Sequence, residues 1–262
     1  MSEDCLYLNV IRPSGYDNVS LPVAVWIHGG GFTTGASRLP GYNLSFIVEN
    51  SVRIGKPVIG VSIACRLAGW GFLSSQQVSG HGETNMALRD QRMALHRIQE
   101  NIAAFGGDND KVTIWGESAG AASVGSHLTA YNGRDDKLFW AAIMQSCNPV
   151  FYFSFETESY YQPAYDQLVE ITNCTSAIDS LDCLRQAPFE PINKFFNSSA
   201  GSNWQPIVDG DIIAHWGSQQ LKDGAFVHVP IIDGVNSDEG TSFSPKGVNS
   251  EAEFAFDVTR VG

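Results

Sequence analysis

Short apolar runs alternate with longer amphipathic segments along most of this chain. The runs are rich in valine and isoleucine, which is typical of strands buried in a parallel sheet. Strands are predicted on this basis over residues 21–27, 57–63, 111–115, 140–145 and 229–235.

Helical periodicity appears between these strands. Over residues 85–103 four apolar side chains fall on one face, namely Leu88, Leu95, Ile98 and Ile102, and Gly106-Gly107 ends the segment. Further helices are predicted over residues 119–128, 162–171 and 178–185. Strands that alternate with helices predict a mostly parallel sheet covered on both faces. We therefore expect one α/β domain over residues 1–262, with a helical insertion around residues 150–225.

Composition narrows the class of protein. The 262 residues are 43% hydrophobic and 17% charged, and the formal net charge is −12. Nucleic acid is an unexpected partner, because phosphate binding needs a basic stripe and none is present. Stable membrane insertion is also unexpected, since no run approaches eighteen apolar residues. The sequence does not predict an oligomeric state.

Cysteines and glycosylation motifs point to the secretory pathway. Asn-x-Ser/Thr motifs occur at Asn18, Asn43, Asn173 and Asn197, in stretches that are predicted surface loops. Cys174 and Cys183 could close a short loop, which suits an oxidising compartment. The acidic N-terminus, however, lacks the basic and apolar regions of a signal peptide. This conflict leads us to expect that the chain is a piece of a longer, secreted protein.

Residues 116–120, Gly-Glu-Ser-Ala-Gly, match the G-x-S-x-G motif of a nucleophile elbow. A predicted strand precedes the motif and a predicted helix follows it, which is the context that the elbow requires. The tight turn would lift the Ser118 hydroxyl above the sheet and aim the N-terminus of the next helix at a developing oxyanion. A plain strand-to-helix turn is the alternative.

Residues 28–32, His-Gly-Gly-Gly-Phe, directly follow the first predicted strand. Three glycines let the backbone approach a ligand closely and point successive N–H groups into one space, as a tetrahedral intermediate requires. A phosphate-binding loop would need a following Lys-Ser/Thr pair, which is missing. A flexible turn is the other alternative, and the downstream elbow favours an oxyanion hole.

Four ordered motifs make the chain resemble the type-B carboxylesterase/lipase family, which includes cholinesterases and fungal lipases. They are residues 3–9 (EDCLYLN), 101–108 (NIAAFGGD), 112–120 (VTIWGESAG) and 236–241 (NSDEGT). The resemblance covers nearly the whole chain. It implies the α/β-hydrolase fold and hydrolysis of small-molecule or lipid carboxylic esters, and it implies neither a cofactor nor a metal.

The family pattern assigns roles to individual residues. It makes Ser118 the nucleophile, Glu239 the triad acid, and the backbone N–H groups of Gly30, Gly31 and Ala119 the oxyanion donors. Without the resemblance, Glu239 would be interpreted as a solvated carboxylate in a turn.

The resemblance also bears on the cysteines and on Glu117. It pairs Cys174 with Cys183 and gives Cys5 a partner upstream of Met1. Cys65 and Cys147 are expected to be buried free thiols. Glu117, beside the nucleophile, would either tune the site electrostatically or make a buried structural hydrogen bond.

The triad histidine is missing from the expected place. In α/β-hydrolases the order along the chain is serine, acid, histidine, yet all the histidines (residues 28, 81, 96, 127, 215 and 228) precede Glu239. Each is interpreted as structural or solvated. We therefore expect the base to lie in a segment beyond residue 262, and little or no turnover from the chain alone. A non-catalytic binding domain and a fragment that does not fold alone are the alternatives.

Overall fold

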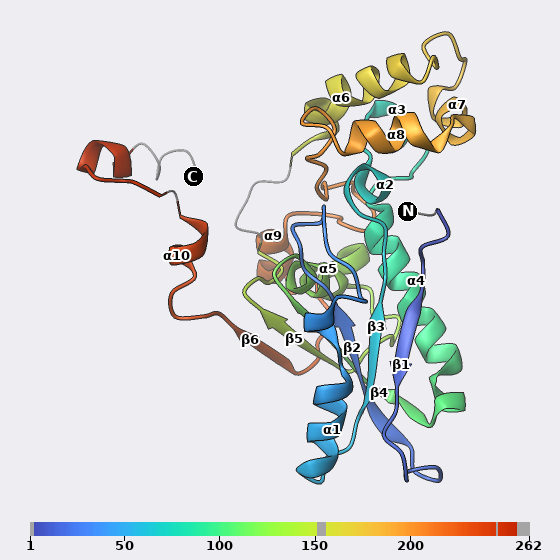
Figure 1. The fold of residues 1–262 in the computed structure, drawn as a ribbon, viewed down its shortest axis with the longest axis vertical. Coiled ribbons are helices and arrows are strands. Elements are labelled where there is room, and N and C mark those ends of the chain that lie inside the picture. Colours follow the sequence, from blue (N-terminus) through green and yellow to red (C-terminus); the bar gives the residue numbers. More distant parts are fainter. Residues whose placement is uncertain (1–2, 151–155, 245, 256–262) are drawn as a thin grey trace.

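Six strands form one mixed sheet in the computed structural model, which describes residues 3–150, 156–244 and 246–255. The sheet order is β1-β3-β2-β4-β5-β6 (Figure 1). The strands are β1 (Leu8–Ile11), β2 (Leu21–Ile27), β3 (Ile59–Ile63), β4 (Gly107–Glu117), β5 (Ala141–Gln145) and β6 (Ile231–Gly234). Only β1 runs antiparallel to its neighbour, so the predicted mostly parallel sheet is confirmed.

Helices cover the sheet and extend beyond one end of it. In chain order they are α1 (Ser45–Arg53), α2 (Ala68–Phe72), α3 (Gln76–Gly80), α4 (Met86–Asn101), α5 (Ala119–Gly133), α6 (Glu158–Ile171), α7 (Ser180–Gln186), α8 (Phe189–Phe196), α9 (Gly217–Lys222) and α10 (Gly240–Phe243). Figure 1 shows α6, α7 and α8 grouped beyond the end toward which the parallel strands point. The description of this group as an insertion in a single domain stays a prediction.

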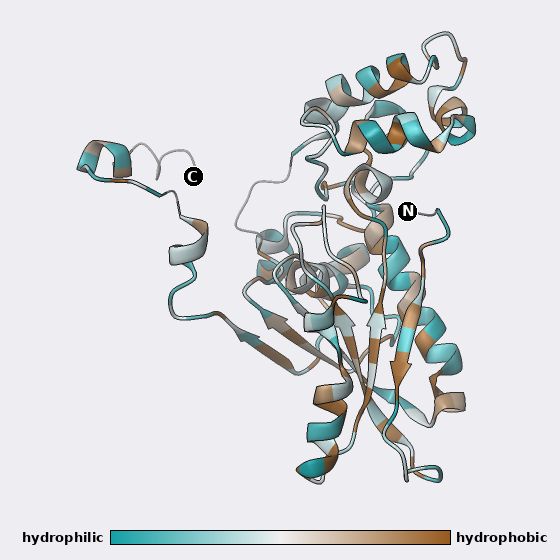
Figure 2. Ribbon diagram, viewed as in Figure 1, coloured by the Kyte–Doolittle hydropathy of each residue, from teal (hydrophilic) through white to brown (hydrophobic). Residues whose placement is uncertain are grey.

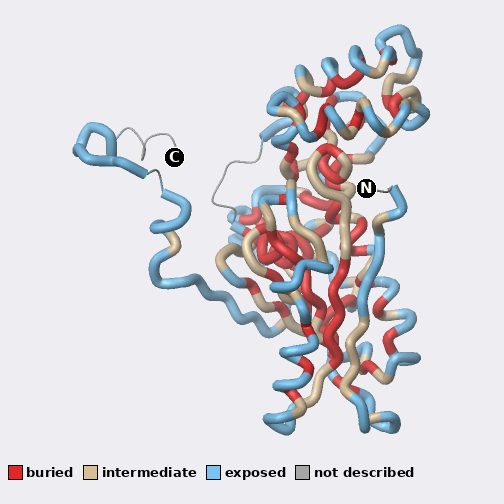
Figure 3. The backbone as a smooth tube through the Cα atoms, in the orientation of Figure 1, coloured by how far each residue is buried: buried red, intermediate tan, exposed pale blue. Residues whose placement is uncertain are grey.

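The core lies where the central strands meet α4 and α5. The side chains of Val25, Val61 and Ile114 are fully buried, and the predicted apolar face of α4 is buried as well. Brown, apolar positions follow these strands in Figure 2, and red, buried positions follow them in Figure 3. The apolar runs of the sequence therefore become the interior of the sheet because burial removes their side chains from water.

Several predicted boundaries are wrong by a few residues. The helix predicted over residues 178–185 begins at Ser180, because the Asp179 side chain caps it by accepting hydrogen bonds from the N–H groups of Leu181 and Asp182. The helix predicted to start at residue 162 starts at Glu158, ahead of Pro163. The helix after Ser118 continues past its predicted end at residue 128 and leaves helical geometry at Ala130.

Among the described residues, one strand and six α-helices were not predicted from the sequence. They are β1, α1, α2, α3, α8, α9 and α10. Strand β1 has only four residues and lies at an edge of the sheet, and all four are exposed or half-buried. All six missed α-helices have nine residues or fewer, so their periodicity is too short to detect.

The disulfide between Cys174 and Cys183 is confirmed, with a Cα–Cα distance of 5.7 Å. It joins the segment directly after α6 to α7. Cys5, Cys65 and Cys147 are free thiols, and Cys65 and Cys147 are half-buried rather than buried as expected. The four glycosylation candidates (Asn18, Asn43, Asn173 and Asn197) are all exposed. Their modification stays a prediction.

The segment from β6 to residue 255 is largely exposed, unlike the central strands. Strand β6 is an edge strand, and all four of its residues are exposed. The chain beyond it, with α10, extends away from the sheet (Figures 1 and 3). No helix in the described part of the chain is long and apolar enough to span a bilayer.

Candidate active site

The candidate site lies at the carboxyl ends of four neighbouring strands. Because β2, β4, β5 and β6 are parallel, the loops that follow them emerge at the same edge of the sheet. These loops carry the glycine loop (residues 28–35), Ser118, Ser146 and Glu239. The sheet thus brings together residues that are more than two hundred positions apart in the sequence.

Ser118 has an unusual backbone conformation, with φ of 55° and ψ of −125°. Such a conformation is costly for a residue with a side chain, and it is characteristic of functional turns. The turn is held because the Ser118 N–H donates to the Gln145 carbonyl at 2.9 Å and the Ser118 carbonyl accepts from Ala122 N–H at 2.9 Å. Helix α5 begins at the next residue, Ala119, as the elbow motif predicts.

Small residues on both sides of Ser118 allow this turn. A Cβ atom on Gly120 would lie 2.1 Å from the carbonyl oxygen of Ile27, at the end of β2. A Cβ atom on Gly116 would lie 2.4 Å from the backbone of Gly120. The glycines of G-x-S-x-G are therefore required by backbone contacts, because strand β4 and helix α5 approach each other and β2 too closely for any side chain.

Hydrogen bonds within the glycine loop hold two of its carbonyl groups. The Gly29 carbonyl accepts from His28 Nδ1 at 2.8 Å, and the Gly30 carbonyl accepts from the N–H groups of Thr33 and Thr34 at 3.2 and 3.0 Å. A trans peptide directs its N–H away from its carbonyl. Across the described residues, no hydrogen bond uses the N–H of Gly30 or Gly31.

A pocket of about 320 Å³ contains Ser118 and two of the three predicted oxyanion donors. Gly31 and Ala119 line it, whereas Gly30 does not. Apolar side chains form part of its wall, and three polar residues, Glu156, Asn203 and Gln205, form another part; the apolar members are Phe32, Ala122 and Tyr161. The sequence did not predict the polar wall, since these positions lie in loops that carry no motif.

Glu239 is held by three hydrogen bonds, all to Oε1. The Ser146 hydroxyl donates one, and Asn236 donates from its backbone N–H at 2.9 Å and from Nδ2 at 3.2 Å. The Ser146 and Asn236 donors hold the pKa of Glu239 below its ordinary value of 4.5, so the carboxyl is ionised at neutral pH. Ser146 was missed, although its position directly after a predicted strand was a usable signal.

The negative charge of the Glu239 carboxylate also acts on Glu117. Burial raises the pKa of Glu117, and the neighbouring Glu239 carboxylate raises it further. No hydrogen bond to the Glu117 carboxylate exists among the described residues. Of the two alternatives for Glu117, this favours electrostatic tuning over a buried structural hydrogen bond.

The model of the carboxylesterase family matches residues 1–261. The chain belongs to the carboxylesterase family. It is 39% identical to "Lipase 2" of Geotrichum candidum and 41% identical to "Lipase 2" of Diutina rugosa, which cover 95% and 94% of the chain. It is 40% identical to "Secreted lipase 1" of Botryotinia fuckeliana over 92% of its length.

The chain spans about half the length of the curated relatives it matches, since it covers 47% of the first two and 44% of the third. Among solved structures it is similar to Aspergillus niger EstA, with a TM-score of 0.83 and 34% identity over 98% of this chain and 50% of that one. These similarities confirm the predicted α/β-hydrolase fold for this carboxylesterase-family chain.

None of the described histidines contacts the proposed nucleophile or acid. Four are exposed (His81, His96, His215 and His228), and His81 pairs with Asp179 at 2.9 Å. His28 is buried and bonded to the glycine loop. His127 is buried in α5, where its Nε2 donates to Gln91 Oε1 at 3.0 Å. Each histidine therefore has the structural or solvated setting that the sequence predicted.

His127 predicts a pH dependence of stability. Burial, with a smaller contribution from the positive charge of Arg92, lowers the pKa of His127 from 6.5 to about 3. Below pH 6.5 the unfolded chain binds a proton that the folded chain does not, so stability is complete above pH 6.5 and falls as the pH drops toward 3. The expected slope is about 1.4 kcal/mol for each pH unit.

Urea denaturation between pH 4 and 8 measures this slope. His127→Gln should remove it, whereas His96→Gln, on the exposed side of α4, should leave it unchanged. An unchanged slope in His127→Gln would show that another group causes the acid sensitivity.

Metal-dependent chemistry has no evident site in the described ranges. No group of three or more His, Cys, Asp or Glu side chains is arranged to hold a metal ion there. The chemistry available at the site is that of a serine hydroxyl, backbone N–H groups and a carboxylate.

Proposed function

We propose that this chain carries the nucleophile, the acid and the oxyanion hole of a serine carboxylic-ester hydrolase. The observation that carries the proposal is the position of Ser118, which stands at a strained turn in one pocket with Gly31 and Ala119. Glu239 follows β6, which lies two strands from β4 in the sheet, and supplies an ionised carboxylate at the same edge.

The proposed reaction is acyl transfer through a covalent intermediate. Ser118 Oγ attacks the ester carbonyl carbon and gives its proton to a general base. The N–H groups of Gly30, Gly31 and Ala119 stabilise the negative oxygen of the tetrahedral intermediate. The carbon–oxygen bond to the alcohol then breaks, and the base returns the proton to the leaving alcohol. Water, activated by the same base, hydrolyses the acyl-serine and releases the acid.

The base in this proposal is a histidine that residues 1–262 do not contribute. The support is the setting of the chain's own histidines, which are either exposed away from the site or buried in other hydrogen bonds. Glu239 would orient that histidine and stabilise its charged form. A serine without such a base is a weak nucleophile, so residues 1–262 alone should turn over little or no ester.

Small-molecule or lipid esters are the proposed substrates, and the complete protein is proposed to be secreted. The apolar wall of the pocket supports binding of an acyl group. The relative from Botryotinia fuckeliana is named a secreted lipase. The disulfide and the exposed glycosylation motifs support the same compartment.

Labelling with a fluorophosphonate probe tests the proposal. In the chain extended by the coding sequence that follows residue 262, hereafter the extended protein, Ser118 should be the labelled residue in peptide mass spectrometry. Ser118→Ala should lose the label, and Ser126→Ala, in the same helix, should keep it. Equal labelling of Ser118→Ala would overturn the nucleophile, and absence of label in every protein would favour a non-catalytic binding domain.

The same probe tests the origin of the base. Residues 1–262 alone should label much more slowly than the extended protein. Equal rates would overturn the proposal of an external histidine and would leave the role of Ser118 standing.

A further inference from the structure

The glycine loop has three successive carbonyl groups, and a hydrogen bond anchors each of them. His28 holds the Gly29 carbonyl, and Thr33 and Thr34 hold the Gly30 carbonyl, so the first two anchors belong to the loop itself. The third anchor comes from a distant part of the chain. Gln205 Nε2 donates to the Gly31 carbonyl at 3.0 Å, across a sequence separation of 174 residues.

The third hydrogen bond, from Gln205, holds a glycine, which is the residue type with the least restricted backbone. Gly31 has φ of +61° and no side chain to restrict its backbone. The peptide before it is held by Thr34, and the peptide after it is held by Gln205. Since each peptide is planar, fixing both carbonyls fixes the directions of the N–H groups around Gly31. Without Gln205, Gly31 would be held on one side only.

Gln205 is itself held firmly on its N-terminal side. Its backbone N–H donates to the Tyr161 hydroxyl at 3.2 Å. The preceding Trp204 is 1% exposed and stacks on the Tyr161 ring, with the ring centroids 5.0 Å apart. Helix α6, which carries Tyr161, therefore sets the position of Gln205.

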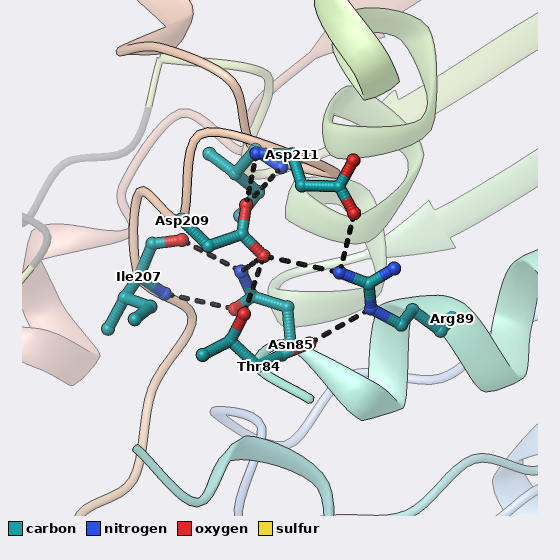
Figure 4. A network of polar contacts seen from close by, with 7 residues as sticks. Thr84, Asn85, Arg89, Ile207, Asp209 and Asp211 are labelled. Atoms are coloured by element: carbon teal, nitrogen blue, oxygen red, sulfur yellow. Dashed lines mark hydrogen bonds and ion pairs between the residues drawn. The ribbon is translucent and has the colours of Figure 1, made fainter. Parts of the chain in front are cut away.

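A polar network holds the segment on the C-terminal side of Gln205, at Ile207 and Asp209 (Figure 4). Asn85, at the start of α4, binds both backbone groups of Ile207: Oδ1 accepts from the N–H at 3.0 Å, and Nδ2 donates to the carbonyl at 2.8 Å. Asp209 then accepts from Thr84 and Asn85 at 2.8 and 2.9 Å, and Arg89 approaches it at 3.6 Å. The segment that carries Gln205 is thus fixed to α4 as well as to α6.

We propose that Gln205 is a positioning residue for the oxyanion hole. It transmits the rigidity of α4 and α6 to the peptide that follows Gly31. By restricting rotation about the Gly31 backbone, it helps to keep the preceding peptide, which carries the Gly31 N–H, in one orientation before substrate arrives. The catalytic part of this proposal rests on the function proposed above. The competing role is that Gln205, which also lines the pocket beside Ser118, is only a wall for the acyl group.

Gln205→Met tests the proposal, because methionine is also unbranched and fills similar space but cannot donate a hydrogen bond. In the extended protein, kcat for p-nitrophenyl esters should fall about tenfold. This fall is larger than the loss of one neutral hydrogen bond would cause and smaller than the loss of a whole oxyanion donor would cause. KM should change less than about twofold, because the interaction improves the transition state rather than the substrate complex. The fall should be equal for acetyl, butyryl and octanoyl esters.

Gln219→Met is the matched control, because Gln219 is exposed on α9 and, among the described residues, its side chain bonds only Asp223. It should leave kcat unchanged. A change in KM that grows with acyl length in Gln205→Met would overturn positioning in favour of a pocket wall. An unchanged kcat would overturn any catalytic role for Gln205.

Hydrogen–deuterium exchange tests the hydrogen bond from Gln205 to Gly31 without relying on ester hydrolysis. The peptide covering the glycine loop should exchange faster in Gln205→Met than in the unsubstituted protein, while the peptide covering β2 should exchange at the same rate. Unchanged exchange of the loop would overturn the anchor itself. If the unsubstituted protein hydrolyses no ester, the proposed function fails, and exchange still decides whether Gln205 holds the loop.

Discussion

Glu239→Gln in the extended protein is expected to lower kcat/KM for p-nitrophenyl butyrate about 10⁴-fold, which is the size of effect seen when the acid of a serine-hydrolase triad becomes an amide. The substitution preserves shape, so Ser146 and Asn236 can still donate to the side-chain oxygen. It removes the negative charge that would stabilise a protonated histidine. The loss should therefore appear in kcat rather than in stability.

The pH profile adds a second readout for Glu239. Because Ser146 and Asn236 lower the pKa of this carboxyl below 4.5, Glu239 stays ionised at every pH above that value. The acid limb of the activity profile near neutral pH should then belong to the histidine base. Asp238→Asn changes the adjacent, exposed carboxyl and should leave activity unchanged. A loss of less than tenfold in Glu239→Gln would exclude Glu239 as the triad acid.

Gly120→Ala is expected to destabilise the fold severely and to abolish labelling of Ser118. The added methyl carbon would lie 2.1 Å from the carbonyl oxygen of Ile27 and 2.9 Å from that of His28. Ile27 is the last residue of the central strand β2, and the buried His28 follows it directly, so neither carbonyl can move away without distorting the end of that strand. The free energy of unfolding should fall by about 3 kcal/mol or more, at the upper end of the cost of overpacking a core.

Gly80→Ala is the matched control for this prediction. Gly80 lies in α3, and an added Cβ atom would meet nothing within 4 Å. Alanine at that position should change stability by less than about 1 kcal/mol, in the stabilising direction. Thermal unfolding followed by circular dichroism measures both variants. Similar melting temperatures for Gly120→Ala and the unsubstituted chain would show that the elbow tolerates a side chain.

The central strands were predictable because burial on both faces makes their sequences continuously apolar. Strand β2 was predicted at the residues that form it, and α4 was predicted to within two residues at each end. The edge strand β1 and the short helices were not predictable, since half-exposed strands and single helical turns leave no periodic signal. Helix starts also depended on capping, as Asp179 shows for α7.

The amino-acid sequence by itself singled out the residues that are proposed to perform the chemistry. Ser118 and the three glycines stand in motifs, because an elbow and an oxyanion loop each need small residues at fixed local spacing. The proposed role of Glu239 came from the family resemblance. Local spacing acts within a few residues, so a motif can be recognised without the fold. The resemblance carried by these motifs also predicted the disulfide, which the structure contains.

Only the tertiary structure decided how these residues are held. The partners of Glu239, the closeness of Gly120 to β2 and the bond from Gln205 to Gly31 all join segments that are distant in the sequence. Such contacts depend on strand order and on the depth at which loops pack, and neither leaves a pattern along the chain. The sequence therefore named the proposed nucleophile, and the fold showed which distant side chains keep its surroundings in place.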